Sequence, residues 1–198
     1  MNAADVRVEN RGVGLTTELV ERAQRGDHEA FDALASAAYH RLYAIARRIL
    51  RDGYAAEDAV QDALVRAWRD VRGLRDPDKF DAWLHRLLVN ACHDQVRRSR
   101  RRAVEVPTLS IERAEPRDDF AQLADRDELE RAFLELSIEH RAVLVLTHYV
   151  GLPAPEIGRI LGIPPGTVAS RLHYGARAMR AALGRSDLPP ATIPEPGR

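Results

Sequence analysis

Residues 154–173 read Ala154-Pro-Glu-Ile-Gly-Arg-Ile-Leu-Gly-Ile-Pro-Pro-Gly-Thr-Val-Ala-Ser-Arg-Leu-His173 and carry the clearest structural signal in the chain. Two short helices that meet steeply through a tight turn need a small residue where they cross, and Gly158 supplies it. The turn needs a residue that tolerates a positive φ, which Gly162 does. Pro164 and Pro165 can begin the second helix, where a missing N–H is harmless. The stretch therefore predicts a helix-turn-helix.

The second helix of this pair, expected over 165–183, has an apolar side and a polar side. At about 100° per residue, Val168, Leu172 and Met179 share the apolar side. The polar side and its flanks carry donors, acceptors and positive charge, which suit the major groove of DNA. These candidate DNA-reading residues are Thr167, Ser170, Arg171, His173, Tyr174 and Arg177. The alternative is an ordinary helical hairpin with a solvated polar face.

The rest of the chain indicates an all-α protein, because apolar residues recur every three or four positions and no strand pattern stands out. We expect two small four-helix domains, at 15–103 and 128–184, joined by a flexible linker at 104–127 that is polar and interrupted by prolines. Residues 1–14 and the proline-rich tail 185–198 are expected to be disordered. The expected helices lie at about 17–26, 27–52, 55–71 and 79–102, then at about 127–136, 138–150, 154–161 and 165–183.

Composition excludes several classes of protein. The 30 basic and 30 acidic side chains balance, so a local basic patch, not net charge, would have to bind nucleic acid. No apolar run approaches the roughly 18 residues of a membrane span. The N-terminal stretch also lacks the apolar core of a signal peptide, so we expect a cytoplasmic protein.

The chain offers little for enzymatic or metal chemistry. Cys92, the only cysteine, can form neither an internal disulfide nor a cysteine zinc site, and we expect it to be buried. No His-Glu-x-x-His motif and no phosphate-binding glycine loop occurs, and His85, His93 and Asp94 do not share one helix face. We therefore expect no enzyme, no cofactor, no bound metal and no small-molecule substrate.

The helix expected at 79–102 ends in a cluster of arginines: Arg97, Arg98, Arg100, Arg101 and Arg102. A stripe along this helix, at spacings of four, three and four, is formed by Asn90, Asp94, Arg97 and Arg101. An amide and arginines beside a core can contact bases and phosphates, and Asp94 can hold Arg97 or Arg98 in place. The alternative is a solvated basic helix end, which the helix dipole favours.

The helix expected at 55–71 has an acidic and amide face made of Glu57, Asp58, Gln61 and Asp62. Acidic residues are common near helix starts because the dipole favours them, so a partner-binding face and a solvated helix start both stay open. Asp62 lies opposite the apolar stripe, and reversing its charge is therefore expected to cost the fold little.

Residues 15–184 resemble the extracytoplasmic-function (ECF) sigma factors of bacterial RNA polymerase in three segments. Ala56-Glu-Asp-Ala-Val-Gln-Asp-Ala-Leu-Val-Arg-Ala-Trp68 is similar to the family's polymerase-binding segment. Phe80-Asp-Ala-Trp-Leu-His-Arg-Leu-Leu-Val-Asn90, with the acid and arginines that follow it, is similar to the segment that reads and melts the minus-ten element. The helix-turn-helix is similar to the minus-thirty-five reader, although Ala169 stands where the family usually has Lys or Arg, which makes this helix less basic.

The resemblance implies that this chain acts as a sigma factor. A sigma factor binds core RNA polymerase, directs it to specific promoters and assists DNA melting. The residues implied at the beta-prime clamp helices are Asp58, Gln61 and Asp62, and the second domain would lie on the beta flap. Those implied at the minus-ten element are Asn90, Asp94, Arg97, Arg98 and Arg101, with the loop at 74–78 helping Asn90 to hold an unstacked base. The helix-turn-helix residues would enter the major groove of the upstream element.

The resemblance also implies regulation by a membrane-anchored anti-sigma protein. The alternative is a helix-turn-helix regulator that is not a polymerase subunit.

The expected linker can reach between the two promoter elements but does not hold the domains apart. The elements lie about 70 Å apart, two turns of roughly 34–36 Å, and residues 104–127 can stretch to at most about 80 Å at roughly 3.3–3.6 Å per residue. The relaxed span of such a flexible chain is only about 27 Å. We therefore expect domains that move independently, a compact free chain with some DNA-binding surface covered, and a separation that polymerase sets.

Overall fold

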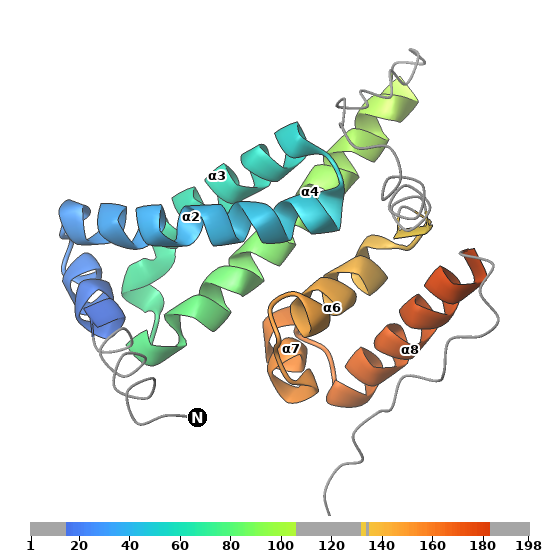
Figure 1. The fold of residues 1–198 in the computed structure, drawn as a ribbon. Coiled ribbons are helices and arrows are strands. Elements are labelled where there is room, and N and C mark those ends of the chain that lie inside the picture. Colours follow the sequence, from blue (N-terminus) through green and yellow to red (C-terminus); the bar gives the residue numbers. More distant parts are fainter. Residues whose placement is uncertain (1–14, 106–131, 134, 183–198) are drawn as a thin grey trace, which may run out of the picture.

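The computed structural model describes residues 15–105, 132–133 and 135–182, and every regular element in these ranges is a helix (Figure 1). The first domain contains a helix at 15–24, α2 (His28–Leu50), α3 (Gly53–Asp70) and α4 (Phe80–Glu105), with 3-10 turns η1 (Val71–Gly73) and η2 (Pro77–Lys79). The second contains α6 (Ile138–His148), α7 (Ala154–Leu161) and α8 (Pro165–Ala182), preceded by helical residues 132–133. The expectation of an all-α protein with two helical domains is confirmed.

Aspartates begin α2 and α3 of the first domain. The Asp27 carboxylate accepts a 3.1 Å hydrogen bond from the backbone N–H of Ala30, and Asp52 accepts one of 2.9 Å from Ala55. Each bond satisfies one of the backbone donors that a helix start leaves unpaired. Between these caps, Arg51 adopts a left-handed conformation with φ 61° and ends α2. The short turn at 51–52 sets α2 and α3 side by side.

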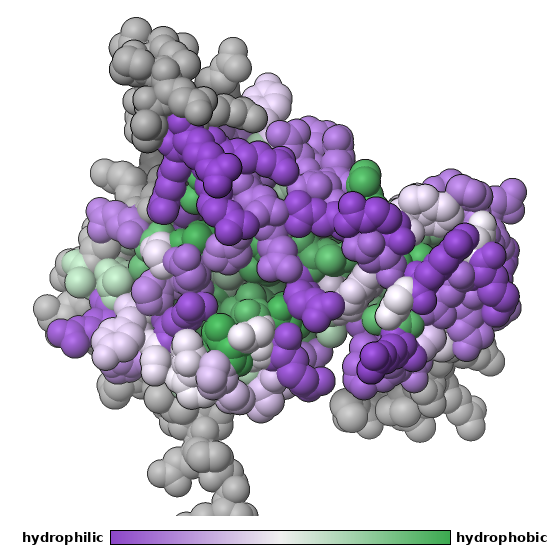
Figure 2. Space-filling model, turned by 180° about the vertical axis from the view of Figure 1, so that it is seen from behind, coloured by the Kyte–Doolittle hydropathy of each residue, from purple (hydrophilic) through white to green (hydrophobic). Residues whose placement is uncertain are grey.

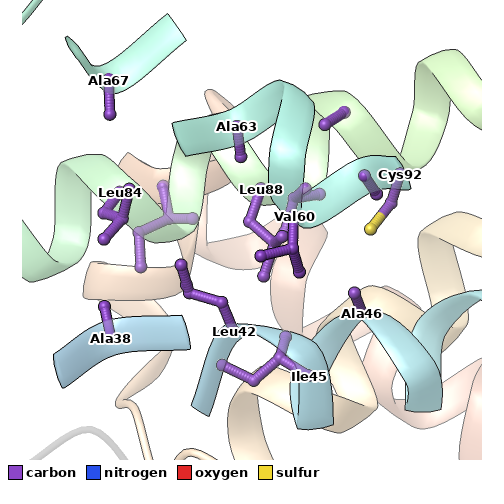
Figure 3. Packing of buried hydrophobic residues seen from close by; sticks show 14 of the residues in the cluster. Ala38, Leu42, Ile45, Ala46, Val60, Ala63, Ala67, Leu84, Leu88 and Cys92 are labelled. Atoms are coloured by element: carbon purple, nitrogen blue, oxygen red, sulfur yellow. The ribbon is translucent and has the colours of Figure 1, made fainter. Parts of the chain in front are cut away.

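The core of the first domain lies where α2, α3 and α4 meet (Figure 3). Leu42 and Ile45 of α2 face Leu84 and Leu88 of α4, and all four side chains are fully buried. The buried side of α3 is made of small residues, Ala56, Ala59, Ala63 and Ala67, together with Val60. Small side chains let helices approach closely, so the outer face of α3 lies near the exposed face of α4. Cys92 is buried in this core, as the sequence predicts.

In the second domain, Gly162 takes a φ of 66° between α7 and α8, and Gly158 lies at the helix crossing. A Cβ at Gly158 would come 2.7 Å from the backbone oxygen of Ile163, so only glycine fits there without movement. Both glycine roles that the sequence predicts are confirmed. The Ser137 hydroxyl caps α6, as expected.

The two domains pack against each other, with α6 against α2 and α7 against α4 (Figure 1). Buried apolar side chains of both domains form one continuous cluster. At the edge of this contact the Arg48 guanidinium lies 3.7 Å from the ring centroid of Tyr149, a cation–π contact between the domains. Seen from behind, the surface is mostly hydrophilic, with apolar side chains visible in recesses between charged ones (Figure 2). The expectation of a compact chain agrees with this packing, whereas independent movement of the domains stays a prediction.

Some expected boundaries differ from the structure. Helix α4 ends at Glu105, not near 102, so the helix continues into the segment expected to be linker. The rest of that linker, the N-terminal segment 1–14 and the tail 185–198 lie outside the described residues. Within the described ranges, no helix is long and apolar enough to cross a membrane.

His85 of α4 is a buried polar group, and the fold should lose stability at acidic pH because a proton on His85 is unfavourable in the folded chain. The side chain is 5% exposed, and its Nε2 has no hydrogen-bond partner in the described part of the chain. Burial, aided by the charge of Arg41, lowers the pKa of His85 to about 4. The unfolded chain therefore binds a proton below about pH 6.5 that the folded chain binds only near pH 4. Between these pH values the free energy of unfolding should fall by roughly 3 kcal/mol on account of this residue.

The measurement is urea denaturation of the wild type and of His85→Leu from pH 7 to pH 4. The variant should lose less stability than the wild type over this window. His40→Gln, at an exposed position of α2, is the control and should follow the wild type. An equal pH dependence for all three proteins would contradict the assignment.

Candidate nucleic-acid interface

The outer face of α3 carries exposed and half-buried side chains with different surroundings. Glu57, Asp58 and Gln61 are exposed, whereas Asp62 is half-buried. The Asp62 carboxylate accepts two hydrogen bonds from Arg66, 3.2 Å from Nε and 2.8 Å from Nη2. The sequence predicts that reversing the charge of Asp62 costs the fold little, but this charge is tied to a neighbouring guanidinium, so we expect a larger cost. Asp58 and Gln61 are the predicted contact residues that remain open to a partner.

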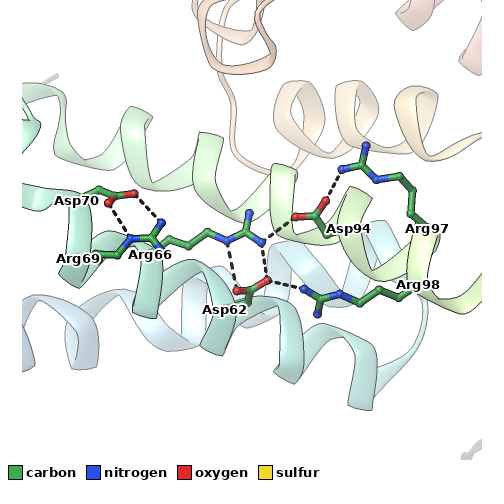
Figure 4. Close-up of polar contacts among 7 residues, drawn as sticks. All are labelled: Asp62, Arg66, Arg69, Asp70, Asp94, Arg97 and Arg98. Atoms are coloured by element: carbon green, nitrogen blue, oxygen red, sulfur yellow. Dashed lines mark hydrogen bonds and ion pairs between the residues drawn. The ribbon is translucent and has the colours of Figure 1, made fainter.

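The predicted stripe of α4 lies beside this face (Figure 4). Arg66 donates a second bond from Nη2 to Asp94, at 2.7 Å, and so joins α3 to α4. The other oxygen of Asp94 accepts from Arg97, while Arg98 turns to Asp62 with an N–O distance of 3.5 Å. Asp94 thus holds Arg97, and Asp62 pairs with Arg98. Asn90 and Arg101 are exposed on the same helix.

These pairings keep the groups charged. The hydrogen bond from Arg97 lowers the pKa of Asp94, and the bond from Arg66 adds to the effect. The bond to Asp94 in turn raises the pKa of Arg66. Arg66 was not among the residues singled out from the sequence. Its spacing of four from Asp62 is the signal that could have indicated it.

A polar cleft of about 620 Å³ separates this stripe from the second domain. The cleft is lined by Arg66, Asn90, His93, Asp94, Val96, Arg97, Arg100, Ile138 and Glu139. The last two residues belong to the first turn of α6. The first turn of α6 therefore forms part of the wall of the cleft that Asn90 also lines, and Glu139 brings a negative charge to this cleft. In this packed arrangement the stripe is not fully open to a DNA strand.

The recognition helix α8 presents its polar side to solvent. Ser170, His173, Tyr174 and Arg177 are exposed, while Thr167 and Arg171 are half-buried. The rings of His173 and Tyr174 lie 5.6 Å apart in an edge-on arrangement. The Ser170 hydroxyl donates 2.9 Å to the backbone oxygen of Gly166, which leaves its oxygen as an acceptor. On the other side, Val168 is buried.

Comparison with known proteins decides between the interpretations of this helix pair. Residues 34–102 match the family model described as sigma-70 region 2, and residues 126–179 match that of sigma-70, region 4. The chain is 37% identical over 169 residues to the ECF RNA polymerase sigma factor SigM of Mycobacterium tuberculosis, covering 85% of this chain and 82% of that protein. The chain belongs to the ECF sigma factors.

Other relatives agree with this membership. The ECF RNA polymerase sigma factor SigW of Bacillus subtilis is 27% identical, and the match covers 83% of this chain and 94% of that protein. CnrH, solved in complex with the cytosolic domain of CnrY, superposes with a TM-score of 0.62 at 28% identity, over 87% of this chain and 99% of CnrH. RpoE, solved with the anti-sigma factor NepR from Bartonella quintana, has a TM-score of 0.66 at 24% identity, over 79% of this chain and 98% of RpoE, and supports the fold.

The membership settles the broad function. This ECF sigma factor directs RNA polymerase to promoters and acts in transcription initiation. The family consists of initiation factors and not of enzymes. A regulator with only a helix-turn-helix would not match region 2 over residues 34–102, so that alternative is not favoured.

Proposed function

We propose that this sigma factor docks on core RNA polymerase through Asp58, Gln61 and Asp62 of α3 and reads promoter DNA with α4 and α8. The observation that carries the proposal is the direct contact between the two faces, since Asp62 and Asp94 share the Arg66 guanidinium. A polymerase subunit on α3 would therefore lie next to the DNA that α4 reads. The deciding experiment is run-off transcription with core polymerase, with and without this chain, followed by mapping of start sites. Start sites that do not depend on the chain would contradict the proposal.

The minus-ten element is assigned to the exposed side of α4. Asn90 has an amide that can donate to and accept from one base edge. The arginines that follow carry the positive charge that phosphates require. The residues assigned here are Asn90, Asp94, Arg97, Arg98 and Arg101, and the loop at 74–78, which precedes α4, is assigned to the same element.

Asn90→Ala should change selectivity at one downstream promoter position. Loss of one base-specific contact costs about 1–3 kcal/mol at that base and little elsewhere. The measurement is transcription from promoters substituted at each minus-ten position, with wild-type and variant holoenzyme. The variant should tolerate changes at a single position that the wild type rejects. If every promoter lost activity equally, Asn90 would have a structural role instead.

The upstream element is assigned to α8. Thr167, Ser170, Arg171, His173, Tyr174 and Arg177 form its polar side. Because Ala169 removes a positive charge that relatives usually carry, phosphate attraction is weaker here. Contact of the second domain with the beta flap of the polymerase would compensate for this weaker phosphate attraction, because it would hold α8 at the DNA.

Polymerase must also separate the domains, because the packed arrangement cannot span two elements about 70 Å apart. Spin labels at Tyr54→Cys and Tyr174→Cys can report the separation, since these positions are 72% and 59% exposed. Cys92 should stay unlabelled, because burial raises the pKa of its thiol to about 12. We expect a short distance in the free chain and a longer one in the holoenzyme. An unchanged distance would contradict the opening of the domains by polymerase.

Regulation is proposed by analogy with the solved relatives. CnrH was solved with CnrY and RpoE with an anti-sigma factor. We infer an anti-sigma partner for this chain, anchored in the membrane, that covers polymerase-binding surface of a sigma factor acting in the cytoplasm. No enzymatic activity, cofactor or small-molecule substrate is part of this function. Affinity purification from the native cell that recovers polymerase but no further specific partner would contradict the regulatory proposal.

A further inference from the structure

Arg66 stands at the centre of a chain of five charged side chains that crosses from α3 to α4 (Figure 4). The order of contacts is Arg98, Asp62, Arg66, Asp94 and Arg97. Arg66 is 25% exposed and makes three hydrogen bonds to the two carboxylates. The ends of the chain are more exposed, 49% at Arg98 and 69% at Arg97.

Arg66 determines which of the other arginines the two carboxylates neutralise. Three guanidinium groups share two carboxylates, so the group carries one net positive charge. Arg66 lies within 2.8 Å of an oxygen of each carboxylate, whereas Arg98 is 3.5 Å from Asp62. The central arginine therefore satisfies the acids, and Arg98 is left weakly paired. A weakly paired, exposed arginine is the kind of group that a phosphate can attract.

We propose that Arg66 is a positioning residue that couples polymerase docking on α3 to promoter binding by α4. By bonding both oxygens of Asp62, Arg66 keeps this acid from neutralising Arg98, and by sharing Asp94 with Arg97 it weakens the hold of Asp94 on Arg97. Donors of a docked polymerase surface at Asp62 take the oxygen that Arg98 shares, and Arg98 is then released toward DNA phosphate. The release step rests on the docking role proposed for Asp62.

The proposal predicts that a second substitution reverses part of the effect of the first. In Arg66→Gln, Asp62 has only Arg98 as a cationic partner in this group, and Asp94 has only Arg97. Arg98 is then drawn to Asp62, and Arg97 is held more tightly by Asp94, so both offer less positive charge to the DNA. In Arg66→Gln combined with Asp94→Asn, Arg97 is free again. A purely structural role would make the double variant no better than the single one, whereas the coupling role makes the second change restorative.

The experiment measures promoter affinity of full-length holoenzymes as a function of salt, because the slope counts phosphate contacts at about 0.9 each. We expect Arg66→Gln to lower the slope by about one to two, and the double variant to recover about one. Arg66→Lys should lie between the wild type and Arg66→Gln, because an ammonium keeps the charge without the planar fork that reaches both acids. Arg69→Gln is the matched control: the same charge is removed from the same helix, but Arg69 pairs with Asp70 at 3.0 Å, and its slope should equal that of the wild type.

The outcomes separate the coupling from the docking assignment. An unchanged slope for Arg66→Gln, or a double variant that does not recover, overturns the positioning role. An equal loss of slope in Arg69→Gln also overturns the positioning role, because removal of any positive charge from α3 would then explain the effect. Asp62→Ala tests docking separately. Normal assembly of this variant with core polymerase would contradict the docking role of Asp62 and the release of Arg98. The salt slopes would still show whether Arg66 protects the arginines of α4.

Discussion

Asp58→Arg should lower the affinity for core RNA polymerase by about 30-fold or more, the loss typical when one member of an interfacial charge pair is changed. Asp58 is exposed on α3, one turn before Asp62. The acidic and amide face of α3 is expected to bind a cationic surface of the polymerase. Reversal of the charge of Asp58 places a guanidinium against that surface. The fold should tolerate the change, because exposed substitutions usually alter stability by less than about 0.5 kcal/mol.

The measurement is the dissociation constant of the chain and core polymerase, together with the thermal midpoint of the free chain. Asp32→Arg makes the same charge reversal at an exposed position of α2 and should bind polymerase normally. If Asp58→Arg bound as well as this control, α3 would not be the docking face. A lowered thermal midpoint for Asp58→Arg alone would instead trace the loss to folding.

Asp58 is a sharper test than Asp62, although the sequence made Asp62 look equally suitable. A third arginine at Asp62 would lie beside Arg66 and Arg98 and would leave Asp94 as the acid bonded to Arg66 in this group. Repulsion among these groups would destabilise the contact between α3 and α4. A binding defect in that variant would therefore mix docking with folding. The difference follows from a contact across helices that helical periodicity does not reveal.

The fold was largely predictable because its determinants are local. Asp27 and Asp52 precede helices that they cap, and Gly162 marks the turn that its positive φ allows. The sequence predicts an end of α4 near 102, which is too early. No helix breaker follows the arginines until Pro107, and continuation to Glu105 therefore costs little.

The candidate site was predictable only in part, since its geometry depends on residues distant in sequence. The bond between Arg66 and Asp94 joins positions that are 28 residues apart, and no periodic pattern specifies such a pair. The contact of Arg48 with Tyr149 and the cleft that Glu139 shares with Asn90 depend on how the domains pack. Sequence reasoning could name the polar faces of α3, α4 and α8. It could not show which of their side chains are already paired or which face the other domain.

Gly158→Val should disrupt the helix-turn-helix while leaving the first domain folded. A Cβ at this position would come 2.7 Å from the backbone oxygen of Ile163 and 3.6 Å from the backbone nitrogen of Pro165. Backbone atoms cannot rotate away as a side chain can, so α7 and α8 would have to move apart. The expected cost is about 3 kcal/mol, at the upper end of what overpacking typically costs, and valine's two further methyl groups add to the crowding.

Gly166→Ala is the matched control for this variant, because a Cβ there would meet nothing within 4 Å and alanine favours helix. Transcription from promoters that need the upstream element should fall strongly with Gly158→Val and stay normal with Gly166→Ala. Assembly with core polymerase through α3 should persist in both, since Asp58 and Gln61 lie in the other domain. Proteolysis of the free chain should show early cleavage within 138–182 only for Gly158→Val. Normal upstream-dependent transcription by Gly158→Val would mean that the helix crossing can widen, and that the close contact at Gly158 does not set the angle at which α8 meets DNA.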